Sequence, residues 1–207
     1  MHTESIDFLV RDLYAELRAL DLPVPSRLTY PSVLEEIDRA IWPARLPSSV
    51  RRLWELIDPD RLVVSSYPEL STPEFGLEAW HMNREDDVIP RHLFQFCYSS
   101  HDVLSVECDG LDWTGGALFE WFLSDNSPFQ LRYRGAEDWL VALISALRQG
   151  AFERDGGSVT LDMDQIAEIA ARLTREDPHP DYGSRAEFAR ETSDWPEVWS
   201  KRSGTVS

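Results

Sequence analysis

The chain has 207 residues, of which 43% are hydrophobic and 11% aromatic, enough to build the core of one globular domain. Acidic side chains outnumber basic ones by 37 to 20, which gives a formal net charge of −17. This charge argues against a nucleic-acid-binding protein, because a surface that follows phosphates needs an excess of positive charge. The longest apolar run, from Trp139 to Leu147, falls far short of the roughly 20 residues that span a bilayer, so no membrane segment is expected.

The beginning of the chain does not resemble a secretory signal. Glu4, Asp7 and Asp12 stand where a signal peptide has a basic stretch followed by an apolar run. The two cysteines, Cys97 and Cys108, form no C-x-x-C pair and cannot supply a zinc site by themselves. These features predict a cytoplasmic protein with reduced thiols.

The first third of the chain is predicted to be helical. Apolar residues recur at helical spacing from Ile6 to Leu20, and charged residues fall mostly on the other side of the helical wheel. A second helix is expected to begin at Ser32, which forms a capping box with Glu35, and to end before Pro43. Pro47 suits the first turn of a third helix. The apolar stripe of that helix has four members, Val50, Leu53, Trp54 and Ile57.

The middle of the chain is predicted to be antiparallel β-structure. Residues 62–64 form a short strand candidate, residues 67–75 hold two prolines and are expected to be a loop, and an extended run is expected from Phe75 to Trp80. The strongest hairpin signal joins residues 93–98 to residues 103–108 across a short polar loop. Two more strands are expected after the Gly115-Gly116 turn, at 119–123 and 130–133.

The hairpin register follows from its apolar pattern. Pairing Tyr98 with Asp102 places one set of apolar side chains on one face, namely Phe94, Phe96, Leu104, Val106 and Cys108. In this register Cys97 points to the other face of the sheet. We therefore expect Cys97 and Cys108 to be unable to form a disulfide.

The chain returns to helix after the β region. One helix is predicted from Trp139 to Leu147 with Gly150 as its C-terminal cap, and another begins at Asp162 with Gln165 in the capping-box position. The whole pattern predicts an α+β fold, in which a central, mostly antiparallel sheet packs against N-terminal and C-terminal helices. We expect one domain over residues 1–176. Residues 177–207 form a tail in which Trp195 and Trp199 suggest a short docked helix.

The histidines give no metal pattern. His81, His92 and His101 match neither helical zinc spacing nor a zinc finger, so they are expected on the surface or in loops. Cys97 and His101 could serve as a nucleophile and its base, but no strained elbow, oxyanion-hole glycine or nearby arginine accompanies them. An inert cysteine in a strand is the favoured interpretation.

The acidic motifs have structural explanations as well. Asp162 and Asp164 resemble a D-x-D magnesium-binding pair at the end of a strand, but Asp162 suits a helix N-cap better. Asp109, Asp112 and Glu120 flank a glycine turn without the spacing of a calcium loop. The sequence therefore predicts no catalytic residue, no cofactor and no metal site.

The acidic excess is concentrated in the β region. Residues 61–130 hold 12 acidic and three basic side chains. This excess is either a solvated face that aids solubility or a docking surface that attracts a basic protein. Trp113 is either an anchor of that docking surface or a core residue that closes its loop. The candidate partner-binding residues are Glu85, Asp86, Asp87, Asp109, Asp112 and Trp113.

Five segments in the middle of the chain resemble the SUKH superfamily, the Smi/Knr-like domains. They are LPSSVRRLW at 46–54, IPRHLF at 89–94, SSHDVLSV at 99–106, GGALFEW at 115–121 and EDWL at 137–140. The similarity covers residues 41–150 and consists of apolar positions and turns. It carries no catalytic or binding residue to a position of this chain.

The resemblance implies an α+β fold and a role that needs no active site. Bacterial members act as immunity proteins that neutralise toxins, often nucleases or deaminases, and fungal relatives act as interaction scaffolds. We expect a non-enzymatic immunity protein whose acidic β region faces basic groups of a toxin, without nucleic acid or membrane as a partner. The alternative is a regulatory adaptor of the Smi/Knr type without a toxin partner, and an enzyme would need a pocket that gathers the histidines or Cys97 with acids.

Overall fold

The computed structural model describes residues 5–27, 32–65, 68–85, 92–99, 102–110, 115–122 and 130–175. The helices are α1 (Ile6–Ala19), α2 (Ser32–Ala40), α3 (Ser48–Leu56), α4 (Pro73–Glu85), α5 (Ala136–Gln149) and α6 (Met163–Arg175), with a 3-10 turn at Pro59–Arg61. The strands are β1 (Val64–Ser65), β2 (Glu69–Leu70), β3 (Leu93–Tyr98), β4 (Asp102–Glu107), β5 (Leu118–Phe122), β6 (Gln130–Tyr133), β7 (Phe152–Asp155) and β8 (Ser158–Leu161). The predicted α+β fold is confirmed.

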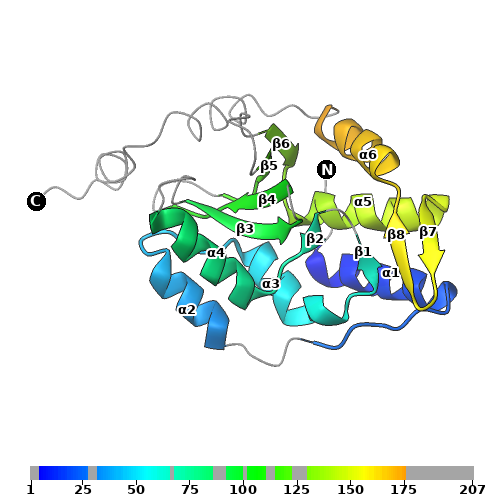
Figure 1. Ribbon diagram of the computed structural model, residues 1–207, viewed down its shortest axis with the longest axis horizontal. Helices are drawn as coiled ribbons and strands as arrows, with labels where there is room; N and C mark the ends of the chain where they lie inside the picture. Colours follow the sequence, from blue (N-terminus) through cyan, green and yellow to red (C-terminus); the bar gives the residue numbers. More distant parts are fainter. Residues whose placement is uncertain are drawn as a thin grey trace, which may run out of the picture.

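The strands form two sheets (Figure 1). The larger sheet has the order β2-β3-β4-β5-β6, and every neighbouring pair in it is antiparallel, as predicted. The smaller sheet has the order β1-β8-β7, in which β1 runs parallel to β8. The hairpin of β7 and β8 and the short strand β2 were not predicted.

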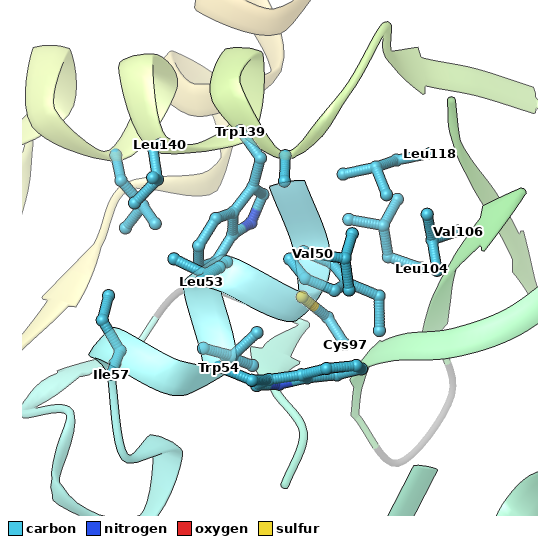
Figure 2. Packing of buried hydrophobic residues seen from close by; sticks show 14 of the residues in the cluster. Val50, Leu53, Trp54, Ile57, Cys97, Leu104, Val106, Leu118, Trp139 and Leu140 are labelled. Carbon is cyan, nitrogen blue, oxygen red and sulfur yellow. The ribbon is translucent and has the colours of Figure 1, made fainter. Parts of the chain in front are cut away.

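One face of the larger sheet packs on α3 and α5 (Figure 2). Helix α1 packs against these two helices (Figure 1). Trp54 of α3 lies 6.1 Å from Phe94 and 5.9 Å from Phe96 between ring centroids, and Phe96 lies 5.2 Å from Trp139 of α5. The indole N–H of Trp54 donates to the carbonyl of Ser71 at 3.0 Å. The predicted packing of the sheet on helices from both ends of the chain is confirmed, but α1 packs on α3 and α5 rather than on the sheet.

The predicted end of α5 at Gly150 and the predicted start of α6 at Asp162 are both confirmed by their caps. Gly150 ends α5 with a φ of 70°, the left-handed conformation that glycine adopts without a steric penalty. The Asp162 carboxylate accepts the backbone N–H groups of Asp164 and Gln165 at the start of α6, and the Gln165 amide donates back to it at 3.0 Å. Asp162 is thus an N-cap, as predicted. Trp195, Trp199 and the rest of the tail lie outside the described residues.

The loop predicted at 67–75 and the extended run predicted from Phe75 are wrong, because this region contains β2 and the helix α4. The alternation of Phe75, Leu77 and Ala79 mimics a strand. The signal for a helix lies in the residues just before this alternation. Thr72 caps the helix by accepting the Phe75 N–H at 3.2 Å, and Pro73 occupies the first helical position.

The predicted hairpin register holds for only half its length. Leu93, Phe94 and Gln95 pair as expected, but a bulge at Phe96 shifts the pairing, so that Cys97 lies opposite Leu104. Cys97 consequently joins Cys108 in the same hydrophobic core, and the prediction of opposite faces is wrong. The two thiols remain free. Cys97 lies opposite Leu104, and Leu104 is four residues from Cys108, about 13 Å along the strand, which is too far for a disulfide.

Among the described residues, no helix has both the length and the apolar character needed to cross a membrane.

Candidate functional site

The structure describes one of the predicted partner-binding residues in full. Asp109 is half-buried and accepts the N–H of Gly115 at 2.8 Å, and its backbone pairs with Arg45. Burial raises the pKa of the Asp109 carboxyl. Its carboxylate holds the backbone at Gly115, shortly before β5, which is a structural role.

The other predicted contact residues have no described side chains. Glu85 ends α4, but its side chain is not described. Asp86, Asp87, Asp112 and Trp113 lie outside the described residues. The two interpretations of Trp113 therefore both remain predictions.

The structure separates the histidine and cysteine candidates. His81 is exposed on α4 with its ring 5.2 Å from that of Trp80. His92 lies in the turn just before β3, one of the two places expected for the histidines, but it is buried and not on the surface. His101 lies outside the described residues. The thiol of Cys97 is fully buried, and this burial raises its pKa well above the usual range. A substrate cannot reach a thiol placed among the core side chains of Figure 2.

The feature best suited to bind a partner is an open groove between α2 and α4, which pack side by side. We call it the acidic groove, and it has a volume of about 400 Å³. Its lining consists of Val33, Glu36, Glu74, Leu77, Glu78, His81 and Met82.

The floor of the acidic groove is apolar and its rim is negative. Val33 and Leu77 are buried at its base, and the side chain of Met82 is 52% exposed beside them. Glu36, Glu74 and Glu78 are exposed, and no lysine or arginine belongs to the described lining. The arrangement combines a small apolar contact area with an unbalanced negative field.

Helical spacing brings these side chains into line. On α2, Leu34 and Ile37 face the core, which leaves Val33 and Glu36, three residues apart, toward the groove. On α4, Glu74, Glu78 and His81 follow one another at intervals of four and three residues. The groove thus combines one stripe from each helix.

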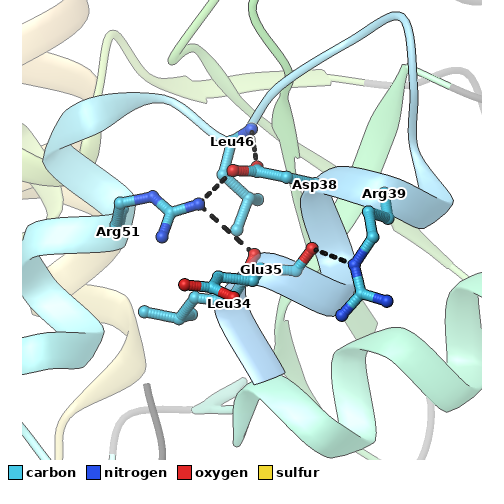
Figure 3. A network of polar contacts seen from close by, with 6 residues as sticks. All are labelled: Leu34, Glu35, Asp38, Arg39, Leu46 and Arg51. Carbon is cyan, nitrogen blue, oxygen red and sulfur yellow. Dashed lines mark hydrogen bonds and ion pairs between the residues drawn. The ribbon is translucent and has the colours of Figure 1, made fainter. Parts of the chain in front are cut away.

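A polar network fixes α2 against α3 (Figure 3). The Arg51 guanidinium forms an ion pair with Asp38 and donates to the carbonyl of Leu34 at 3.3 Å. The other Asp38 oxygen accepts the N–H of Leu46 at 3.2 Å. Because three backbone segments meet at this ion pair, the wall of the acidic groove formed by α2 is held in place.

The described residues offer no metal centre, since no three His, Cys, Asp or Glu side chains gather where they could hold one ion. The acidic groove did not follow from the sequence, because the alternating pattern of residues 75–80 predicted an extended run where the structure has α4. The Thr72-Pro73 cap was the signal that could have revealed α4 and the groove.

No protein-family model matches the chain, and no curated protein matches it significantly.

Proposed function

We propose that this chain is a non-enzymatic immunity protein that binds a basic toxin domain and neutralises it by covering its functional surface. The observation that carries the proposal is the acidic groove, with three exposed carboxylates around an apolar floor. The resemblance to SUKH immunity proteins supports the choice of a toxin as the partner.

The carboxylates of the groove are available to a partner. No salt bridge links Glu36, Glu74 or Glu78 to any basic side chain in the described part of the chain, and all three are exposed. Lysine or arginine side chains of a partner can therefore approach them without breaking an existing pair. The net charge of −17 extends this attraction beyond the contact itself and favours rapid association.

The test compares two charge-reversed variants as baits in cells of the source organism. Glu36→Lys/Glu78→Lys reverses one carboxylate on each side of the groove, and Glu153→Lys/Glu168→Lys makes the same change in charge at exposed positions on β7 and α6. We expect one basic protein to co-purify with the wild type and the control variant and to be lost from the groove variant.

A growth assay then tests whether the captured partner is a toxin. Expression of the captured basic protein should arrest growth, and co-expression of the wild type should relieve the arrest while the groove variant does not. A partner that both variants retain contradicts the groove assignment. A harmless partner contradicts the immunity role and favours the adaptor.

A further inference from the structure

A second hollow lies between the larger sheet and the last two helices. Its volume of about 310 Å³ is at the lower end of the range for small-molecule sites. Strands β4, β5 and β6 supply one side, and α5 and α6 supply the other. It shares no described residue with the acidic groove.

One part of this pocket is apolar. Its lining includes four buried side chains, Trp139 and Leu143 of α5, Leu104 of the sheet and Ile166 of α6. Ala167 of α6 lies at the rim and is exposed. These surfaces can cover a ring or a branched alkyl group.

The polar part contains an unused phenol. The Tyr133 side chain is 7% exposed and lines the pocket. Its hydroxyl forms no hydrogen bond with any residue in the described part of the chain. The hydroxyl is not one of the fully enclosed polar atoms that lack a partner, so it opens into the pocket, where a ligand can form a hydrogen bond with it. Burial also raises the pKa of Tyr133, which keeps the hydroxyl protonated and able both to donate and to accept.

The charges beside the phenol favour a cation. The pocket contains three carboxylates, those of Asp102, Glu120 and Asp164, and one guanidinium, that of Arg132. Arg132 is already engaged, because it forms an ion pair with Glu120 and its Nε donates at 2.6 Å. The remaining charge of the pocket is negative, and this favours a positively charged head group over a carboxylate or phosphate.

We propose that this pocket binds a small organic amine whose apolar body lies against Trp139 and whose ammonium group donates to the Tyr133 hydroxyl and to Oε1 of Glu120, since both contacts of Arg132 use Oε2. This site is separate from the proposed protein-binding groove and does not depend on it. Recognition combines burial of the apolar body with two charge-assisted hydrogen bonds from the ammonium group.

Calorimetric titration of the full chain with three probes tests the chemical class. The probes are 2-phenylethylamine, the neutral 2-phenylethanol and the anionic 3-phenylpropionate, which share a ring and differ in the head group. A ligand of this size should bind with a Kd of about 1 mM. We expect the amine to bind and the other two to bind at least about 10-fold more weakly.

Two variants test whether the amine binds in this pocket. Tyr133→Phe removes only the hydroxyl and should weaken binding by about 3- to 10-fold. Ala167→Phe should fill the rim and abolish binding, whereas Ala15→Phe, on the exposed side of α1, should leave it unchanged. The groove variant Glu36→Lys/Glu78→Lys should bind the amine like the wild type, so failure of either proposal is distinguishable from failure of the other.

Three results would overturn the assignment. Absence of amine binding means that the pocket is not a site for this class of ligand. Equal binding of the alcohol, or tighter binding of the acid, contradicts recognition of a cation. Binding that survives Ala167→Phe with unchanged affinity places the amine elsewhere on the protein.

Discussion

Trp54 combines ring packing and a hydrogen bond in the core. Its ring packs against two phenylalanines of β3, and its N–H donates to the carbonyl of Ser71, which lies between β2 and α4. One side chain thereby joins α3, the sheet and the approach to α4. Its place in the apolar stripe of the third helix was predictable from spacing. Its hydrogen bond was not, because Ser71 gives no sequence signal for a contact with α3.

Trp54→Ala should lower the free energy of unfolding by about 3–5 kcal/mol, because it leaves a large cavity and frees the Ser71 carbonyl. The control is Trp42→Ala, since Trp42 is 65% exposed and its loss should change stability by no more than about 0.5 kcal/mol. Urea unfolding measures both. Similar losses for the two variants would contradict the central position of Trp54.

Asp109→Asn tests the half-buried carboxylate. Burial raises the folded-state pKa of Asp109 above its ordinary value of 3.8, so the folded protein holds the proton more tightly than the unfolded chain. This tighter proton binding stabilises the folded protein at pH values below 3.8, and the stabilisation is lost as the pH rises from there through the folded-state pKa of Asp109. Asparagine keeps an oxygen for the Gly115 N–H without the charge.

The Asp109→Asn variant should therefore have a higher Tm than the wild type near neutral pH, and the difference should shrink as the pH falls toward 3.8. Thermal unfolding across this pH range measures it. A variant that melts lower than the wild type near neutral pH would show that the ionised carboxylate stabilises the fold through its bond to the Gly115 N–H.

Helices and strands with strong local sequence signals were predictable, and those that depend on a neighbouring strand were not. Amphipathic spacing and caps identified five helices and the central hairpin. The strand-like alternation in α4 concealed its cap, and the bulge at Phe96 reflects how β3 fits its neighbours rather than any local pattern. Strands as short as β1 and β2 exist only because a partner strand lies beside them.

At the C-terminal end of α5, Gly150→Ala should destabilise the protein by about 1 kcal/mol, because alanine is strained at a φ of 70°. Gln149→Ala, at the exposed last residue of the same helix, is the control and should have little effect. Chemical denaturation separates the two. Equal stability of Gly150→Ala and the wild type would mean that the helix end relaxes into another conformation.

At the scale of the whole molecule, the fold explains why the functional surface was hard to predict. The sequence indicated an acidic protein with a partner-binding surface, and the predicted contact residues fell at 85–87 and 109–113. The acidic groove instead brings Glu36 of α2 beside Glu74 and Glu78 of α4, from helices about 40 residues apart in the chain. Only the packing of α2 on α4, supported by the Asp38–Arg51 ion pair, places these carboxylates together.

The most direct test of the proposed function is the association rate between this chain and its captured basic partner at about 50 mM and about 500 mM salt. The wild type should associate at least about 10-fold more slowly at high salt. The groove variant Glu36→Lys/Glu78→Lys should already be slow at low salt and respond much less. A rate that neither salt nor the two substitutions change would contradict binding through the acidic groove.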